Sequence, residues 1–255
     1  MLEDFLVTSA LAFMLSFVRM GTAVMIIPGI GDSFVSQKVR LFFAVAMAFV
    51  LFPLIIDKVP SPLPGTSALL TLIIMEFVIG LFYGTIARIF MTALDTAGMV
   101  ISFSSSLSNA QLFNPSLSAQ GSLVGAFLSV TGVVFLFSTN LHHLLIMGIV
   151  ESYEMFPLGG LPDTGSMADF VSRAVSSSFM IGIQIGAPFI VMTLVIYVGM
   201  GVLSRLMPQV QVFMLALPLQ ILLSLMTFTF VLGAGLVYWA TQYEDALVFF
   251  LKSAG

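Results

Sequence analysis

The sequence predicts an all-helical membrane protein that enters the bilayer several times. Of its 255 residues, 59% are hydrophobic and only 8% are charged, whereas roughly a quarter of the residues in a soluble domain are charged. Three long stretches carry no charge at all, namely residues 96–150, 174–204 and 206–243. Because about 20 apolar residues span the hydrocarbon core, these stretches have room for several helices. The apolar runs do not alternate with polar residues as the strands of a membrane barrel do, so helices are the expected elements.

The first three of six predicted helical segments are bounded by turn formers and charges. Phe5–Ile27 follows two acidic residues and ends before Pro28. Leu41–Ile56 follows a basic pair, and the turn-rich stretch DKVPSPLPG at residues 57–65 separates it from the third segment, Leu69–Met91.

The last three predicted segments are Leu123–His142, Phe179–Met200 and Val212–Tyr243. An uncharged, serine-rich stretch, SFSSSLSNAQLFNPSLSAQG, precedes the first of them, and ESYEMFPLGGLPDTG separates the first from the second. The stretch SRLMPQ lies before the last segment. No polar stretch is long enough for a soluble domain, so we expect residues 1–255 to form a single membrane-embedded domain.

Prolines within or at the ends of the hydrophobic runs predict that several segments are kinked. These prolines are Pro28, Pro53, Pro188, Pro208 and Pro218. A proline lacks the N–H that the helix needs, and its ring clashes with the preceding turn. Irregular backbone at membrane depth is tolerated only where protein or a water-filled cavity surrounds it. The pattern therefore favours a chain with neighbouring subunits and is compatible with a pore lining.

Ionisable residues inside or next to apolar runs need partners. The four that stand out are Arg19, Glu76, Arg88 and Arg205. Such groups cost about 2.5–3.5 kcal/mol at the middle of a membrane helix. Glu76 and Arg88 lie about three turns apart on one helix, so we expect their partners on other helices or chains. Two interpretations of Glu76 remain open, a structural ion pair between subunits and a proton relay.

Motifs for catalysis, metal binding and nucleic-acid binding are missing. The chain has no cysteine, and the adjacent His142 and His143 would point about 100° apart on a helix, so they cannot both face one ion. No HExxH, GxSxG or GxxxxGK[ST] motif occurs. The eight Lys and Arg residues are spread along the chain and form no basic patch. We therefore expect no enzyme activity, no metal, no cofactor and no nucleic-acid partner.

Glycines four residues apart predict close contacts between helices. Gly80 and Gly84 form one such pair, and Gly182 and Gly186 form another. Each pair lies on one helix face, where it lets another backbone approach closely. The spacing alone leaves open whether the second helix belongs to this chain or to a partner subunit.

Several stretches together resemble the flagellar export-gate family of FliR and its type III secretion counterparts. The strongest is GVLSRLMPQVQVFMLALP at residues 201–218, which contains Arg205 and Gln209. MEFVIGLFYG at residues 75–84 and QIGAPFIVM at 184–192 also resemble family segments, and the upstream matches are Arg19, Pro28, Arg40 and Pro53. Two departures are SQKVR, which lacks the family's usual proline, and SFSSS, which replaces a Gln-Met-Gly run.

The resemblance implies a non-enzymatic subunit of a hetero-oligomeric channel through which unfolded flagellar proteins leave the cytoplasm. Its implied partners are FliP-like and FliQ-like subunits, FlhB-like and FlhA-like export components, the unfolded substrates and membrane lipid. The implied location is the bacterial inner membrane, in the flagellar basal body. The implied architecture is a FliP-like part, residues 1–170, followed by a FliQ-like helical hairpin, residues 171–255. Arg19, Glu76, Arg88, Arg205 and Gln209 are then expected in intersubunit or intramembrane polar contacts.

In the family that the chain resembles, the loop after the third segment projects into the channel and helps to close it. That role corresponds here to residues 102–120, with Leu107, Leu112 and Phe113 as the expected sealing groups, since an apolar constriction excludes water. A solvated loop without a gating role is the alternative. Two further alternatives for the whole chain are a subunit of a virulence injectisome and a permease for a small solute, with Glu76 as its proton-coupling group.

Overall fold

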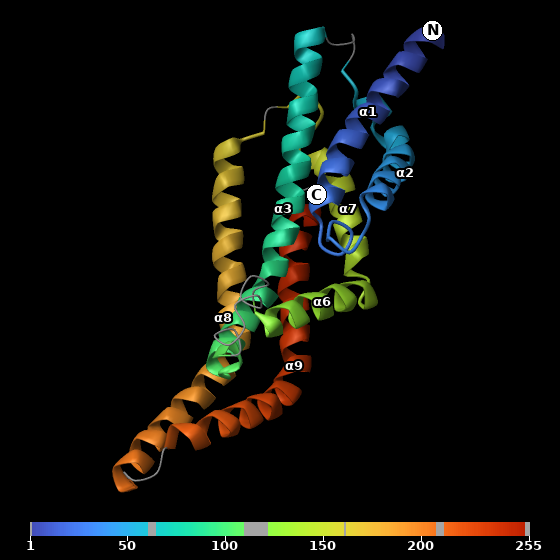
Figure 1. Ribbon diagram of the computed structural model, residues 1–255. Coiled ribbons are helices and arrows are strands. Elements are labelled where there is room, and N and C mark those ends of the chain that lie inside the picture. Colours follow the sequence, from blue (N-terminus) through green and yellow to red (C-terminus); the bar gives the residue numbers. More distant parts are fainter. Residues whose placement is uncertain (1, 61–64, 110–121, 161, 208–211, 253–255) are drawn as a thin grey trace. The chain divides into compact units, whose positions relative to one another are not determined.

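The described part of the chain is helical and contains no strand (Figure 1). The computed structural model describes residues 2–60, 65–109, 122–160, 162–207 and 212–252. The α-helices are α1 (Leu2–Ile26), α2 (Gln37–Ile55), α3 (Thr66–Ser104), α6 (Leu123–Ser138), α7 (Leu141–Met155), α8 (Thr164–Leu206) and α9 (Val212–Lys252). Two short 3-10 helices are η1 (Ile56–Lys58) and η2 (Leu107–Asn109). The predicted all-helical fold is confirmed.

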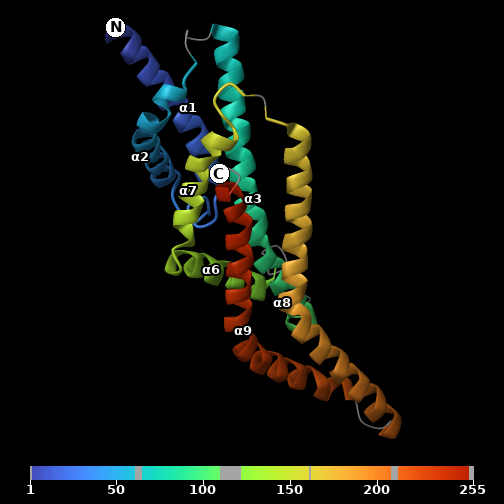
Figure 2. The same cartoon turned by 180° about the vertical axis from the view of Figure 1, so that it is seen from behind.

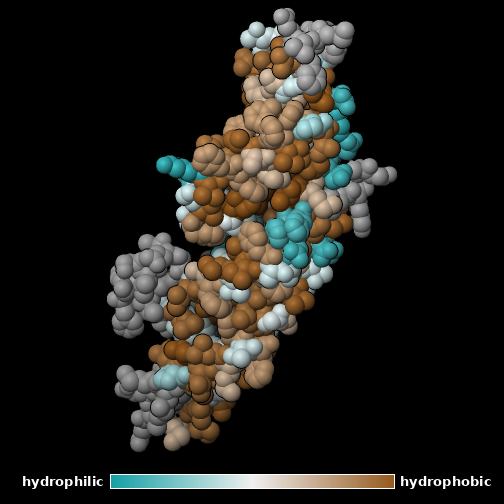
Figure 3. Space-filling view, turned by 90° about the vertical axis from the view of Figure 1, so that its right-hand side faces the viewer, coloured by the Kyte–Doolittle hydropathy of each residue, from teal (hydrophilic) through white to brown (hydrophobic). Residues whose placement is uncertain are grey.

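The helices have the length and composition of membrane spans. Among the described residues, five helical stretches are long and apolar enough to cross a bilayer, and α6 with α7 makes a sixth if the two count as one broken span. The five are Leu6–Ile26, Gln37–Lys58, Thr66–Ser104, Thr164–Leu206 and Ala216–Val248. Apolar side chains cover most of the face seen in Figure 3. The chain is a polytopic membrane protein, as its composition predicts.

α3 and α8 are much longer than their apolar runs predict, and α9 also continues past its predicted end at Tyr243, to Lys252. α3 continues to Ser104, well beyond the predicted end at Met91. The two charges near the predicted end do not interrupt the helix because each has a partner: Arg88 pairs with Asp32, and Asp95 accepts a hydrogen bond from Ser129. α8 begins at Thr164 instead of Phe179, and its early charges form an i,i+4 pair between Asp169 and Arg173.

The predicted segment Leu123–His142 is two helices. α6 ends at Ser138, and α7 begins at Leu141 and continues to Met155, through residues that the sequence predicts as a break. Asn140 between them has a φ of 61°, the left-handed conformation that ends an α-helix and that asparagine tolerates better than most residues. The spacing of apolar residues does not reveal that one residue adopts this left-handed conformation.

Three prolines lie inside helices instead of ending them. Pro53 lies in α2, Pro188 in α8 and Pro218 in α9. Pro28 follows the end of α1, and Pro208 lies outside the described residues. Bends along α8 and α9 are visible from both sides of the molecule (Figures 1 and 2).

The helices form two compact units. Unit 1 contains the described residues of 1–90, 137–174 and 243–255, and unit 2 contains those of 91–136 and 175–242. One apolar cluster of unit 1 joins side chains from α1, from the end of α2 and η1, from α3 and from α7. Its buried members are Leu11, Ala12, Leu15, Ile55, Val59, Leu72 and Tyr153.

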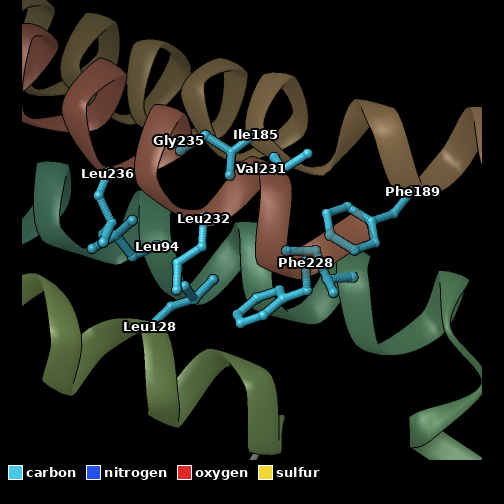
Figure 4. A pocket seen from close by; sticks show the side chains of 10 residues that line it. Leu94, Leu128, Ile185, Phe189, Phe228, Val231, Leu232, Gly235 and Leu236 are labelled. Atoms are coloured by element: carbon cyan, nitrogen blue, oxygen red, sulfur yellow. The ribbon is translucent and has the colours of Figure 1, made fainter. Parts of the chain in front are cut away.

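The core of unit 2 is closed and apolar. Leu94 of α3, Leu128 of α6, Ile185 and Phe189 of α8 and Phe228 of α9 converge there (Figure 4). The cavity that they line has a volume of about 10 Å³, which is room for at most one water. Four helices are therefore packed against one another in this unit.

Candidate functional site

Arg19 and Glu76 form a buried ion pair between α1 and α3 in unit 1. Arg19 is 1% exposed and Glu76 is also 1% exposed. The Arg19 Nε donates to Glu76 Oε2 at 2.6 Å, and Nη2 donates to Oε1 at 2.8 Å. The contact is thus bidentate, the geometry in which arginine and a carboxylate bind each other most strongly. The partner of Glu76 comes from another helix, and it comes from the same chain.

The remaining donors of Arg19 bind the C-terminal end of α7. Nη1 donates to Ser152 Oγ at 3.1 Å, and Nη2 donates to the carbonyl oxygen of Phe156 at 3.0 Å. The guanidinium carbon also lies 3.7 Å from the centre of the Tyr153 ring, where the ring face attracts a cation. One buried guanidinium therefore holds α1, α3 and α7 together, and we name these five residues the arginine cluster.

The sequence spacing on α3 explains how Glu76 reaches Arg19. Glu76, Gly80 and Gly84 are four residues apart and share one face of the helix, which lies against α1. A Cβ on Gly80 would overlap the carbonyl oxygen of Arg19, and one on Gly84 would lie 3.1 Å from that of Ala23. Gly80 therefore lets the two backbones approach closely enough for this carboxylate to meet the guanidinium, and Gly84 avoids a second tight contact on the same face.

The sequence-based reasoning missed the α7 members of the arginine cluster. Ser152, Tyr153 and Phe156 lie in the stretch ESYEMFPLGGLPDTG, which was expected to be a break between helices. Its two glutamates and its prolines suggested a solvated loop. The signal that was available is Tyr153, an aromatic residue that sits among polar ones and is 3% exposed in the structure.

Two other ion pairs of unit 1 join residues far apart in the sequence and lie nearer the surface. Arg88 pairs with Asp32, and Lys58 pairs with Glu154. Asp32 also accepts from the backbone N–H of Gly29 at 2.7 Å, so Arg88 holds the turn that follows α1. Because the Arg88 and Lys58 side chains are 44% and 34% exposed, water screens these pairs, and each contributes about 0–1 kcal/mol.

Arg205, Pro208 and Gln209 form the Arg-Pro-Gln motif of the stretch GVLSRLMPQVQVFMLALP, and the structure describes only the first of them. Arg205 lies in the last turn of α8, is exposed, and has no ion-pair partner in the part of the chain that the structure describes. A positive charge at this position interacts favourably with the negative, C-terminal end of the helix dipole. Gln209 lies outside the described residues.

Gly182 and Gly186 on α8 face α3 in unit 2. A Cβ on Gly182 would lie 2.7 Å from the Cβ of Thr96, and one on Gly186 would lie 2.5 Å from a methyl group of Val100. Real Cβ atoms do not approach so closely. The glycines therefore set a short distance between α8 and α3 within this chain.

Of the three expected sealing groups, the structure describes only Leu107. This residue is half-buried at the start of η2, where it contributes to an apolar pocket of about 420 Å³. The other lining residues are Ile101, Ser105, Leu123, Val124, Phe127, Ser224, Leu225 and Phe228. Leu112 and Phe113 lie outside the described residues.

The adjacent histidines lie at the start of α7. The rings of His142 and His143 are 4.2 Å apart between centres, and the buried His142 Nδ1 has no hydrogen-bond partner among the described residues. The described residues contain no group of three or more His, Asp or Glu side chains that is arranged to hold a metal ion.

Comparisons with known proteins give a consistent result. The sequence matches the family described as "Bacterial export proteins, family 1" over residues 10–246. It is 39% identical over 237 residues to flagellar biosynthetic protein FliR of Caulobacter vibrioides, which covers 92% of this chain and 94% of that one. The FliR of Bacillus subtilis is 32% identical over 216 residues, 84% and 83% of the two chains. Yop proteins translocation protein T of Yersinia pestis is 27% identical over 177 residues, 69% and 67%.

Proposed function

The chain belongs to family 1 of the bacterial export proteins, and we propose from this membership that it is a subunit of the flagellar type III export gate. The observation that carries the proposal is the 39% identity to a FliR along 92% of the chain. This agrees with the resemblance inferred from the Arg-Pro-Gln motif and from the segments upstream of it. The subunit helps to form the channel through which unfolded flagellar proteins are exported, and it has no enzymatic role.

The proposed location and partners follow from the same family. The subunit lies in the bacterial inner membrane, at the flagellar basal body, with FliP-like and FliQ-like subunits and with FlhB-like and FlhA-like components. Residues 1–170 form the FliP-like part, and residues 171–255 form the FliQ-like hairpin. The long helices α8 and α9 support the hairpin. Their exposed apolar side chains, such as Val191 and Phe230, need lipid or other subunits to cover them.

The serine-rich segment, residues 102–120, is proposed to help close the channel, with Leu107, Leu112 and Phe113 as the sealing groups. The support is the absence of charge from this segment and the apolar surroundings of Leu107, since an apolar constriction excludes water. Deletion of residues 109–114 should increase ion leak through the assembled complex. An unchanged leak in the deletion variant, at equal amounts of complex, would show that the segment does not seal the channel.

The subunit role is tested by purifying the tagged chain in mild detergent and measuring the mass of the intact complex. We expect a stable hetero-oligomer in which copies of FliP-like and FliQ-like proteins accompany the tagged chain. A permease would instead remain intact alone and transport a solute after reconstitution.

An injectisome subunit is the second candidate function, because the chain also resembles Yop proteins translocation protein T. The two systems are distinguished by what a deletion strain stops secreting. Loss of extracellular flagellar proteins supports the flagellar role, whereas loss of virulence effectors with normal flagella supports the injectisome role.

A further inference from the structure

The C-terminal end of α3, in unit 2, has backbone carbonyl groups that need hydrogen-bond partners other than water. The last four carbonyl groups of a helix have no partner within the helix, and an unpaired carbonyl in apolar surroundings is costly. Here all four are satisfied. The carbonyl of Ile101 accepts from Ser105 N–H at 2.8 Å, and that of Phe103 accepts from Ser106 N–H at 3.3 Å. The carbonyl of Ser102 accepts from Ser105 Oγ at 3.3 Å.

The fourth carbonyl, that of Ser104, is bound by side chains of two other helices. Thr193 Oγ1 of α8 donates to it at 2.6 Å, and Gln220 Nε2 of α9 donates at 2.5 Å. Gln220 is 1% exposed and Thr193 is 9% exposed. Gln220 interrupts an apolar run of α9, and a buried amide there is costly unless it is hydrogen-bonded. Its bond to Ser104 supplies a physical reason for its position.

Ser122 joins the same region of α3 to α6. Its Oγ accepts from the N–H of Gly125 at 3.0 Å, which caps the first turn of α6, and donates to the carbonyl of Gly98 at 3.0 Å. Because a hydroxyl has one hydrogen, the 2.6 Å contact between Ser122 Oγ and Ser102 Oγ has Ser102 as the donor. Farther along the two helices, Ser129 donates to Asp95.

We propose that these groups form a polar anchor that stays assembled while substrates pass, with Thr193 and Gln220 as positioning residues for the end of α3. The polar anchor is defined by its residues Ser102, Ser104, Ser105, Ser122, Thr193 and Gln220. Taking it apart would leave a carbonyl, hydroxyls and an amide unpaired in apolar surroundings. Within the SFSSS stretch, the Ser102 hydroxyl thus binds Ser122 before α6, and the backbone carbonyl of Ser104 binds α8 and α9. This inference rests on the proposed export function.

The first test uses the absence of cysteine from the chain. In the variant Ser102→Cys with Ser122→Cys, mild oxidation should form a disulfide, because the two Oγ atoms are 2.6 Å apart. The full chain is tested in the complete export complex, and secretion of a flagellar protein is measured before and after oxidation. We expect equal secretion from the oxidised and reduced forms, with both single-cysteine variants as controls for the oxidant.

Secretion that stops on oxidation and returns on reduction would overturn the polar anchor, because it would mean that α3 and α6 must separate. Failure of the disulfide to form would also overturn it, since the two side chains would not be held at the observed distance. Failure of the proposed function looks different, because deletion of the whole chain would then leave secretion of flagellar proteins unchanged.

The second test measures how fast the same disulfide forms when a positioning residue is changed. Thr193→Val and Gln220→Met keep the approximate volume but remove the donors to Ser104, so the end of α3 should move more and the disulfide should form more slowly. Thr193→Ser keeps the hydroxyl and should preserve the parent rate. Thr229→Val is the matched control, because Thr229 is exposed and its hydroxyl donates within α9, to the carbonyl of Leu225. Equal rates in all four variants would contradict the positioning role.

Discussion

At the scale of single residues, Arg19 shows how a charge is accommodated inside this protein. Its guanidinium is buried, yet it makes four hydrogen bonds, and the carboxylate of Glu76 neutralises it. The sequence identified both charges as out of place in apolar runs and required partners on other helices. It did not identify them as each other's partners, because residues 57 positions apart meet only when α3 packs against α1.

The arginine cluster predicts a large loss of stability when one partner is removed. Glu76→Gln leaves the guanidinium buried without a countercharge, so it should destabilise the protein by about 3–5 kcal/mol. Replacing both residues, as Arg19→Met with Glu76→Met, should cost less than that because no charge is stranded. Thermal unfolding of the purified complex in detergent measures both effects.

Lys58→Met is the control for the Glu76 variants, because the pair of Lys58 with Glu154 is exposed. It should change stability by about 0–1 kcal/mol. A similar small change for Glu76→Gln would show that the buried pair does not hold the helices of unit 1 together.

Asp163 predicts a local pH dependence at the start of α8. A hydrogen bond from Ser166 Oγ and bonds from the N–H groups of Gly165 and Ser166 lower the pKa of the Asp163 carboxyl group below its ordinary value. Its stabilising contribution is therefore complete above the ordinary pKa, about 3.9, and is lost as the pH falls through the lower folded pKa. Amide hydrogen exchange at Gly165 and Ser166, corrected for the intrinsic rate, should accelerate over that range.

Asp163→Asn is the control for this pH effect, because it keeps the shape of the side chain but does not titrate there. Its corrected exchange should not change with pH over the same range. Identical pH profiles for the two proteins would rule out the carboxylate as the cause.

At the scale of helices, glycines decide which faces meet. Gly80 and Gly84 bring α3 to α1, and Gly182 and Gly186 bring α8 to α3. Their four-residue spacing was visible in the sequence, but the identity of the facing helix was not, because spacing describes one helix face only. Gly98 had no such pair and was missed as a packing residue, although a Cβ built on it would lie only 2.2 Å from the Cα of Gly125.

Alanine substitution is expected to have different effects at Gly98, where α3 contacts α6 closely, and at Gly199, which has open space around it. A Cβ on Gly98 would overlap the backbone of Gly125, which cannot move as a side chain can, so Gly98→Ala should destabilise unit 2 by about 1–3 kcal/mol. Gly199→Ala in α8 meets no atom within 4 Å and should be neutral or stabilising by up to about 1 kcal/mol, from helix propensity. Thermal unfolding compares the two, and equal effects would contradict the close contact.

The sequence predicted the positions of the helices well but not their ends. Apolar runs located α1, α2 and α9, because a membrane helix must be apolar over most of its length. The end of α3 was placed too early, at Met91, because the continuous apolar run stops there and Asp95 follows, whereas a polar residue with a partner can lie within a helix. The division between α6 and α7 depends on the left-handed φ of Asn140, which hydropathy does not encode.

At the scale of the whole molecule, the most informative property is the large amount of exposed apolar surface, which must be covered when the protein functions. Large apolar side chains are widely exposed, among them Phe42 at 73%, Leu123 at 78% and Phe230 at 81%. Lipid can cover such surface, and so can other subunits. A permease would need no other subunit to transport its solute. The family membership and the similarity to FliR along most of the chain favour an assembly instead.

The central claim, that this chain is required for flagellar protein export, is tested most directly by secretion from a deletion strain. The gene is removed from the bacterium that carries it, and extracellular flagellar proteins are quantified with and without the gene restored on a plasmid. We predict that the deletion abolishes their secretion while they accumulate inside the cell, and that the restored gene recovers it. Undiminished secretion of flagellar proteins by the deletion strain would contradict the claim.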